Sequence, residues 1–99
     1  MRIVSADEAA ILYKLYHREA FGVRGILEAE LFRGFPPNDL ERLRDVLKAL
    51  VADKVVIAKQ TGRGRRIALG STRWEAVYDQ LKRYYDFLPT RVGTGKVLR

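Results

Sequence analysis

A basic segment in the second half of the 99-residue chain contains the residues whose types and spacing best suggest a binding chemistry. The stretch KQTGRGRRIA, residues 59–68, contains two glycines, Gly62 and Gly64, which permit positive φ and let a backbone approach a ligand closely. Cationic side chains neutralise phosphates, and each neutralised phosphate steepens the salt dependence of binding. The segment therefore predicts contact with a polyanion, with nucleic acid favoured. Its four cations are Lys59, Arg63, Arg65 and Arg66.

Three other interpretations of this segment must be weighed. A nucleotide-binding phosphate loop is disfavoured, because a third glycine is missing at the expected spacing and a strand-like run follows in place of a helix. A flexible linker is disfavoured by the apolar runs on both sides. A solvated hairpin tip, with arginines that protect a sheet edge from aggregation, stays open as the alternative to nucleic-acid binding.

The charge of the chain is unevenly distributed along the sequence. Residues 1–58 contain nine cationic and nine acidic side chains, whereas residues 59–99 contain ten Lys or Arg against three acidic residues. The formal net charge of +7 therefore lies entirely in the last 41 positions. Charge segregated in this way predicts a polyanionic partner on one side of the molecule.

A second group of candidate contacts lies in residues 38–52. An apolar stripe turns one side of this segment inward and leaves an outward arc that also contains Glu41 and Asp45. These carboxylates repel phosphates, although a carboxylate can accept from cytosine. If this arc is only a solvated surface, the binding would be largely indifferent to sequence. The candidate contacts of the arc and its flank are Asn38, Arg42, Arg44 and Lys48.

Aromatic residues are concentrated near the C-terminal end, where five of the ten fall within residues 74–87. One small core cannot cover all of them, so they predict either a self-association surface or an exposed stacking surface for single strands. Two-fold association is the commoner solution and is favoured. The expected dimer contacts are Trp74, Tyr78, Leu81, Tyr84, Tyr85 and Leu88.

Several classes of site are excluded by composition. The chain has no cysteine and one histidine, which removes disulfides, thiol nucleophiles and His or Cys metal clusters. No nucleophile–base pair can be proposed, so we expect no enzyme, no cofactor and no metal. Neither a membrane span nor a signal peptide is evident, and we expect a cytoplasmic, nucleoid-associated protein. The single Asn and two Gln beside many charged residues favour a thermophilic source.

The elements that position these residues are predicted from start and stop signals. Ser5 and Glu8 have capping-box spacing and open a helix that we expect to end at Gly22. A second helical segment is predicted from Val23, Leu27 and Leu31, and Gly34 closes it.

A third helix is expected after PPND, with Asn38 as its N-cap and Glu41 at the capping-box distance. Its stripe comprises Leu40, Leu43, Val46, Leu47, Leu50 and Val51. Residues 55–59 and 65–69 predict a β-hairpin. A fourth helix starts at Ser71 or Thr72 and ends before Pro89, and residues 90–99 are expected to form a flexible basic tail.

This order resembles the winged helix-turn-helix superfamily of DNA-binding domains. The resemblance rests on ILEAELFRGF, PNDLERLRDVLKALVADKVVIAK and GRGRRIAL, and makes residues 1–89 one α+β, mostly helical domain. It implies a three-helix core, a β-hairpin wing and an additional C-terminal helix. In such domains the third helix enters the major groove and the wing follows the backbone or minor groove. The fourth helix resembles that of small archaeal and bacterial members that dimerise through it.

We therefore expect a homodimeric protein that binds double-stranded DNA through its basic wing and third helix, as a transcription regulator or chromatin-associated factor. RNA binding shares the same basic hairpin and stays open. The other alternative is a protein-interaction subunit of a larger nucleic-acid-processing complex, which the near-neutral third helix favours.

Overall fold

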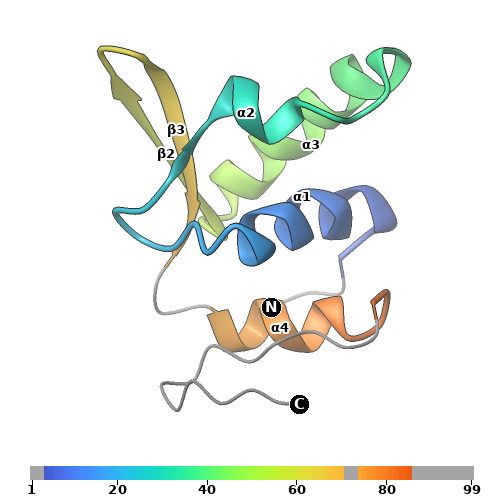
Figure 1. Ribbon diagram of the computed structural model, residues 1–99. Helices are drawn as coiled ribbons and strands as arrows, with labels where there is room; N and C mark the ends of the chain where they lie inside the picture. The colour runs from blue at the N-terminus through green and yellow to red at the C-terminus, as the bar shows by residue number, and fades with distance from the viewer. Residues whose placement is uncertain (1–3, 71–73, 86–99) are drawn as a thin grey trace.

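The computed structural model describes residues 4–70 and 74–85 of the chain. Within these residues the fold is α+β, with four α-helices and one three-stranded antiparallel sheet of order β1-β3-β2 (Figure 1). Helices lie to one side of the sheet, and the hairpin of β2 and β3 projects beyond them. The elements are α1 (Ala6–His17), β1 (Ile26–Leu27), α2 (Glu28–Phe32), the 3-10 helix η1 (Pro37–Asp39), α3 (Leu40–Ala52), β2 (Val56–Thr61), β3 (Gly64–Leu69) and α4 (Trp74–Leu81).

Helix α1 begins as its capping signal predicts. The Ser5 hydroxyl accepts from the Glu8 backbone N–H at 3.1 Å, and the Glu8 carboxylate accepts from the Ser5 backbone N–H at 2.8 Å. The expected end at Gly22 is wrong, because the helix stops at His17 and Glu19 takes a left-handed φ of 56°. The chain then turns through residues 20–25 toward the sheet.

The second helix is much shorter than its apolar spacing predicts. Val23 is fully exposed in the preceding loop, and Ile26 pairs with Ile67 as part of β1, which leaves only five residues for α2. The reason is tertiary: strand pairing with β3 satisfies the backbone of Ile26 and buries its side chain, which outweighs a local helical preference.

Helix α3 confirms its predicted stripe but not its predicted cap. Leu43, Leu47 and Leu50 are buried, whereas Asn38 lies exposed in η1 and makes no cap. The first helical turn after Pro37 is a 3-10 turn, so α3 starts at Leu40, two residues after the expected cap.

The predicted hairpin is confirmed and extends further at its turn than expected. Its register runs from Val56 opposite Leu69 to Thr61 opposite Gly64. Because side chains alternate along a strand, Val56, Ala58, Ile67 and Leu69 face the helices and join or contact the core. The intervening residues face away from the helices, and we call this side of the hairpin the outer face: Ile57, Lys59, Thr61, Arg66 and Ala68.

Helix α4 packs on α1 and ends earlier than predicted. The helix runs to Leu81, after which Tyr84 and Tyr85 both donate backbone hydrogen bonds to the Leu81 carbonyl. Gln80 accepts from the Val4 backbone N–H, so α4 also fixes the start of the chain. The expected cap at Ser71 or Thr72, Leu88, Pro89 and the expected tail lie outside the described residues.

Candidate nucleic-acid interface

The outer face of the hairpin borders a hollow of about 410 Å³. All five outer-face residues line it, and its opposite wall is the loop of Gly22, Val23 and Gly25. Ile57 has 46% of its surface exposed and Val23 all of it, so apolar and cationic groups alternate around this hollow. The hairpin therefore presents a shaped surface and not only a charged tip.

Lys59 and Arg66 lie directly opposite each other on this face. Like charges at cross-strand positions destabilise a sheet when nothing lies between them. Arg66 is held by a hydrogen bond of 2.6 Å from its Nη1 to the Gly25 carbonyl oxygen, a neutral acceptor, and its positive charge also helps to lower the pKa of Glu30. An anion bound between the two side chains would relieve their repulsion.

The third cation of this surface, Arg63, lies in the two-residue turn of the hairpin. Thr61 builds the turn: its hydroxyl donates to the Gly64 carbonyl oxygen at 2.6 Å and accepts from the Arg63 backbone N–H at 3.2 Å. Gly64 has a φ of +125°, which suits glycine. The Arg63 side chain is exposed on this hydrogen-bonded turn, whereas the ion pairs found among the described residues engage Arg18, Arg42 and Arg65.

Arg65 differs from its neighbours although the sequence places it in the same basic run. It points to the helix side of the sheet, where its Nε donates to Glu28 Oε1 at 2.9 Å. Glu28 is the first residue of α2, so this pair joins the hairpin to that helix. The structure separates Arg65, as a paired residue, from Lys59, Arg63 and Arg66.

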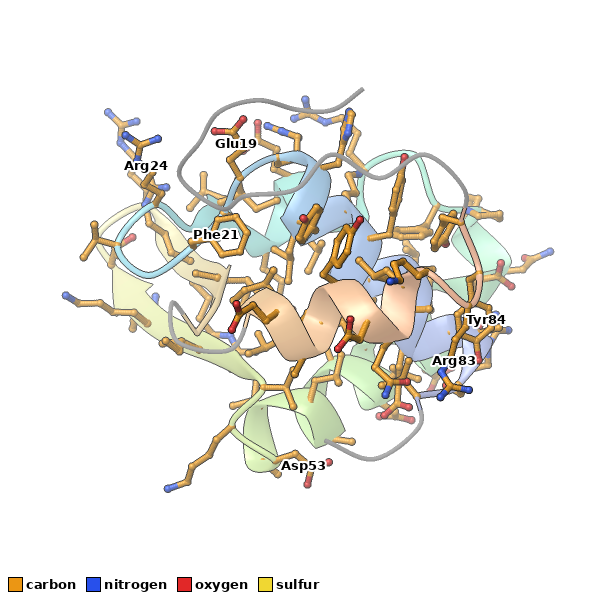
Figure 2. All side chains as sticks on the ribbon, turned by 90° about the horizontal axis from the view of Figure 1, so that it is seen from below. Glu19, Phe21, Arg24, Asp53, Arg83 and Tyr84 are labelled. Atoms are coloured by element: carbon orange, nitrogen blue, oxygen red, sulfur yellow. The ribbon has the colours of Figure 1, made fainter. Side chains whose placement is uncertain are left out.

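Arg24 is a candidate contact that the sequence interpretation missed. It is exposed between Val23 and Gly25, which line the hollow, and Figure 2 shows its side chain pointing away from the body of the protein. The sequence predicts a helix over this segment, and Arg24 is therefore not identified there as a loop residue that could bind a ligand. The two glycines at positions 22 and 25 were the available turn signal.

On the exposed side of α3, the candidate contact Arg42 already forms ion pairs within the protein. Arg42 donates from Nε to Asp7 Oδ2 at 2.8 Å and from Nη1 to Asp39 Oδ1 at 3.1 Å. The hydrogen bonds with Asp7, followed by the one with Asp39, raise the pKa of Arg42. The guanidinium therefore links α3 to α1 and is largely neutralised.

The other α3 candidates are exposed among acidic residues. Arg44 lies over the Phe32 ring at 5.7 Å, and Lys48 is exposed. Glu41 and Asp45 are exposed on the same helix, so the surface has charges of both signs. Such a surface does not by itself attract a polyanion.

The residues expected to form a dimer contact mostly face their own chain. Leu81 is fully buried, Tyr78 packs near Tyr16, and Tyr85 stacks on Tyr13 at 4.2 Å. Tyr84 is 43% exposed, and its hydroxyl donates to the Val4 carbonyl oxygen. In Figure 2 it lies at the end of the molecule opposite Arg24. The Trp74 side chain and Leu88 lie outside the described residues, and homodimerisation stays a prediction that sedimentation analysis would test.

Across residues 4–70 and 74–85, no three His, Asp or Glu side chains gather in a way that could hold a metal ion. No helix in that part of the chain has the length and apolar character needed to cross a membrane. No protein-family model matches this sequence, and neither a curated protein nor a solved structure matches it.

Proposed function

We propose that this protein binds double-stranded DNA through the outer face and turn of its hairpin, largely without sequence selectivity. The observation that supports this most strongly is the state of Lys59, Arg63 and Arg66. The ion pairs found among the described residues engage Arg18, Arg42 and Arg65 instead, and Lys59 and Arg66 lie opposite each other beside a hollow. Phosphate contacts of this kind position a protein on a duplex but carry no sequence information.

The architecture supports the same proposal. The order of helix, short strand, helix, turn, helix, hairpin and helix agrees with the order expected of a winged helix-turn-helix domain. In that interpretation the hairpin is the wing and α3 the recognition helix. Arg42 is bound to Asp7 and Asp39, and Glu41 and Asp45 are exposed on the same helix. In this proposal α3 therefore adds little selectivity for the DNA sequence. This favours a chromatin-associated factor over an operator-specific regulator.

The test compares two double variants with equal charge change. Lys59→Gln/Arg63→Gln removes two outer cations, and Arg44→Gln/Lys48→Gln removes two from α3. Affinity for a random-sequence duplex is measured at several salt concentrations. The hairpin variant should flatten the slope of log K against log salt by about two units, since each phosphate contact contributes about 0.9. The α3 variant should change the slope by less than about one unit.

Three outcomes would overturn the proposal. Equal slope changes in the two variants would show that the hairpin is not the anchor. Absence of duplex binding at micromolar protein in low salt would instead favour a protein-interaction subunit. A parallel titration with duplex RNA separates the two nucleic acids, because tighter binding to RNA would assign the same surface to RNA.

A further inference from the structure

A second concave site lies where α1, the loop between α2 and η1, and the turn after α4 meet. It has a volume of about 370 Å³, within the range of small-molecule pockets. None of the described residues that line it is acidic. The lining residues that matter for its chemistry are Tyr13, Lys14, His17, Arg33, Phe35 and Tyr85.

The walls of this pocket are flat aromatic rings held nearly parallel. The Tyr13 and Tyr85 rings stack with centroids 4.2 Å apart at an interplanar angle of 19°. The His17 ring is 5.8 Å from Tyr13 and tilted by only 15°. Burial, followed by the proximity of Tyr13, raises the pKa of Tyr85. The facing surfaces of Tyr13 and Tyr85 cover each other, so a planar ligand can extend this stack only at one of its ends.

Cationic groups converge on the same pocket. Lys14 Nζ donates to the Arg33 carbonyl oxygen and lies 5.3 Å from the centre of the Phe35 ring. Burial, and then repulsion by Arg18 and Arg33, lowers the pKa of Lys14. Glu30, whose carboxylate counteracts this lowering of the Lys14 pKa, is itself bound to Arg18 at 2.9 Å. Lys14 still has donor capacity, because an ammonium has three N–H groups.

We propose that this pocket binds a small planar aromatic anion. The ring of the ligand would stack on one end of the Tyr13–Tyr85 pair, and its anionic group would accept from Lys14 and Arg33. Nucleoside monophosphates and aromatic carboxylates share this chemistry. The pocket uses none of the proposed DNA contacts, so failure of either proposal leaves the other standing.

The experiment is a calorimetric titration of the full chain with two anions and their uncharged counterparts. The probes are AMP with adenosine, and 2-naphthoate with 2-acetonaphthone. We expect at least one anion to bind one-to-one with a Kd below about 1 mM, and its uncharged counterpart to bind at least fivefold more weakly. Binding of only one anion identifies which source of the shared chemistry the pocket accepts.

Single substitutions test whether the anion binds in this pocket. Arg33→Gln and Lys14→Gln should each weaken the binding roughly fivefold to tenfold. Lys48→Gln, an equal charge change on α3, should alter it less than about twofold. Because Lys14 also holds the Arg33 carbonyl, Arg33→Gln is the decisive variant, with its fold checked by circular dichroism. Ring-proton shifts of Tyr13 and Tyr85 provide a second readout.

Three results would overturn the proposal. The first is that neither anion binds below about 1 mM. The second is that the uncharged counterparts bind as well as the anions. The third is that Arg33→Gln weakens binding no more than Lys48→Gln, which would place the anion elsewhere on the basic surface.

Discussion

The outer face of the hairpin and the exposed side of α3 contain similar numbers of cationic side chains in different electrostatic states. On the hairpin, Lys59 and Arg66 lie opposite each other, and Arg66 donates a hydrogen bond to the backbone carbonyl of Gly25. On α3, Arg42 is bound to Asp7 and Asp39, and exposed carboxylates surround its neighbours. One surface concentrates positive potential, and the other cancels most of it.

The difference shows that the number of cations in a segment does not measure its attraction for a polyanion. What counts is the charge that is left after pairing within the fold, since the carboxylate beside a paired guanidinium neutralises it and repels a phosphate. Arg65 shows the same effect within the hairpin, because its pairing with Glu28 removes it from the outer face. Four predictions test this comparison.

The largest effect is expected from a substitution at Gly25, which packs against β3 and whose carbonyl oxygen holds Arg66. A Cβ at Gly25 would lie 2.9 Å from the Ile67 carbonyl oxygen, which is backbone and cannot move away cheaply. Gly25→Ala should therefore lower the free energy of unfolding by about 1–3 kcal/mol, measured by urea denaturation, and weaken duplex binding.

Gly62→Ala is the matched control for this change. Nothing lies within 4 Å of a Cβ at that position, so we expect a change within about 0.5 kcal/mol. Equal destabilisation by the two variants would show that the close approach of Gly25 to Ile67 of β3 does not support this surface.

The second prediction reverses the comparison by releasing a cation on α3. Asp7→Asn/Asp39→Asn removes the negative charge of both partners of Arg42, and Asp39 makes no side-chain cap to α3 that would be lost. The slope of log K against log salt for duplex binding should steepen by about one unit. The control Glu75→Gln/Asp79→Asn makes the same net charge change on α4 and should have a smaller effect. An equal effect would mean that net charge alone governs binding.

The third prediction separates two arginines that are neighbours in the sequence. Arg63→Gln should flatten the salt slope by about one unit, since its side chain is exposed on the turn. Arg65→Gln should leave the slope nearly unchanged and lower the free energy of unfolding by less than about 1 kcal/mol, the value of an exposed pair. Equal slope changes would show that Arg65 exchanges Glu28 for phosphate.

The smallest effect is expected when the Arg18–Glu30 ion pair is weakened at acid pH. A hydrogen bond from Arg18 is the main cause that lowers the pKa of Glu30. A carboxylate with a lowered folded pKa contributes its full stabilisation above the unfolded pKa and loses it as the pH falls through the folded pKa. Thermal unfolding should therefore show a slightly smaller loss of Tm between about pH 6 and about pH 3 in Glu30→Gln than in the unchanged protein. Identical losses would show that the Arg18 pair contributes nothing.

Much of the framework could be predicted from local signals. The capping box at Ser5 and Glu8, the leucine stripe of α3 and the hairpin around Gly62 each depend on residues close in sequence. The segment of residues 20–33 could not be predicted in this way, because a two-residue strand is stabilised by its partner β3, some 40 residues later. The early end of α4 at Leu81 and the 3-10 start before α3 likewise differ from the periodic pattern.

The sequence by itself determined the composition of the basic segment, the division of charge along the chain and the hairpin that presents the segment. Only the tertiary structure decided which cations stay available. Strand alternation sends Arg65 toward Glu28 and Arg66 to the outer face, and the packing of α1 against α3 brings Asp7 to Arg42. The physical reason is that ion pairing depends on distances of a few ångströms between residues 35 or 37 positions apart, which the linear order does not encode.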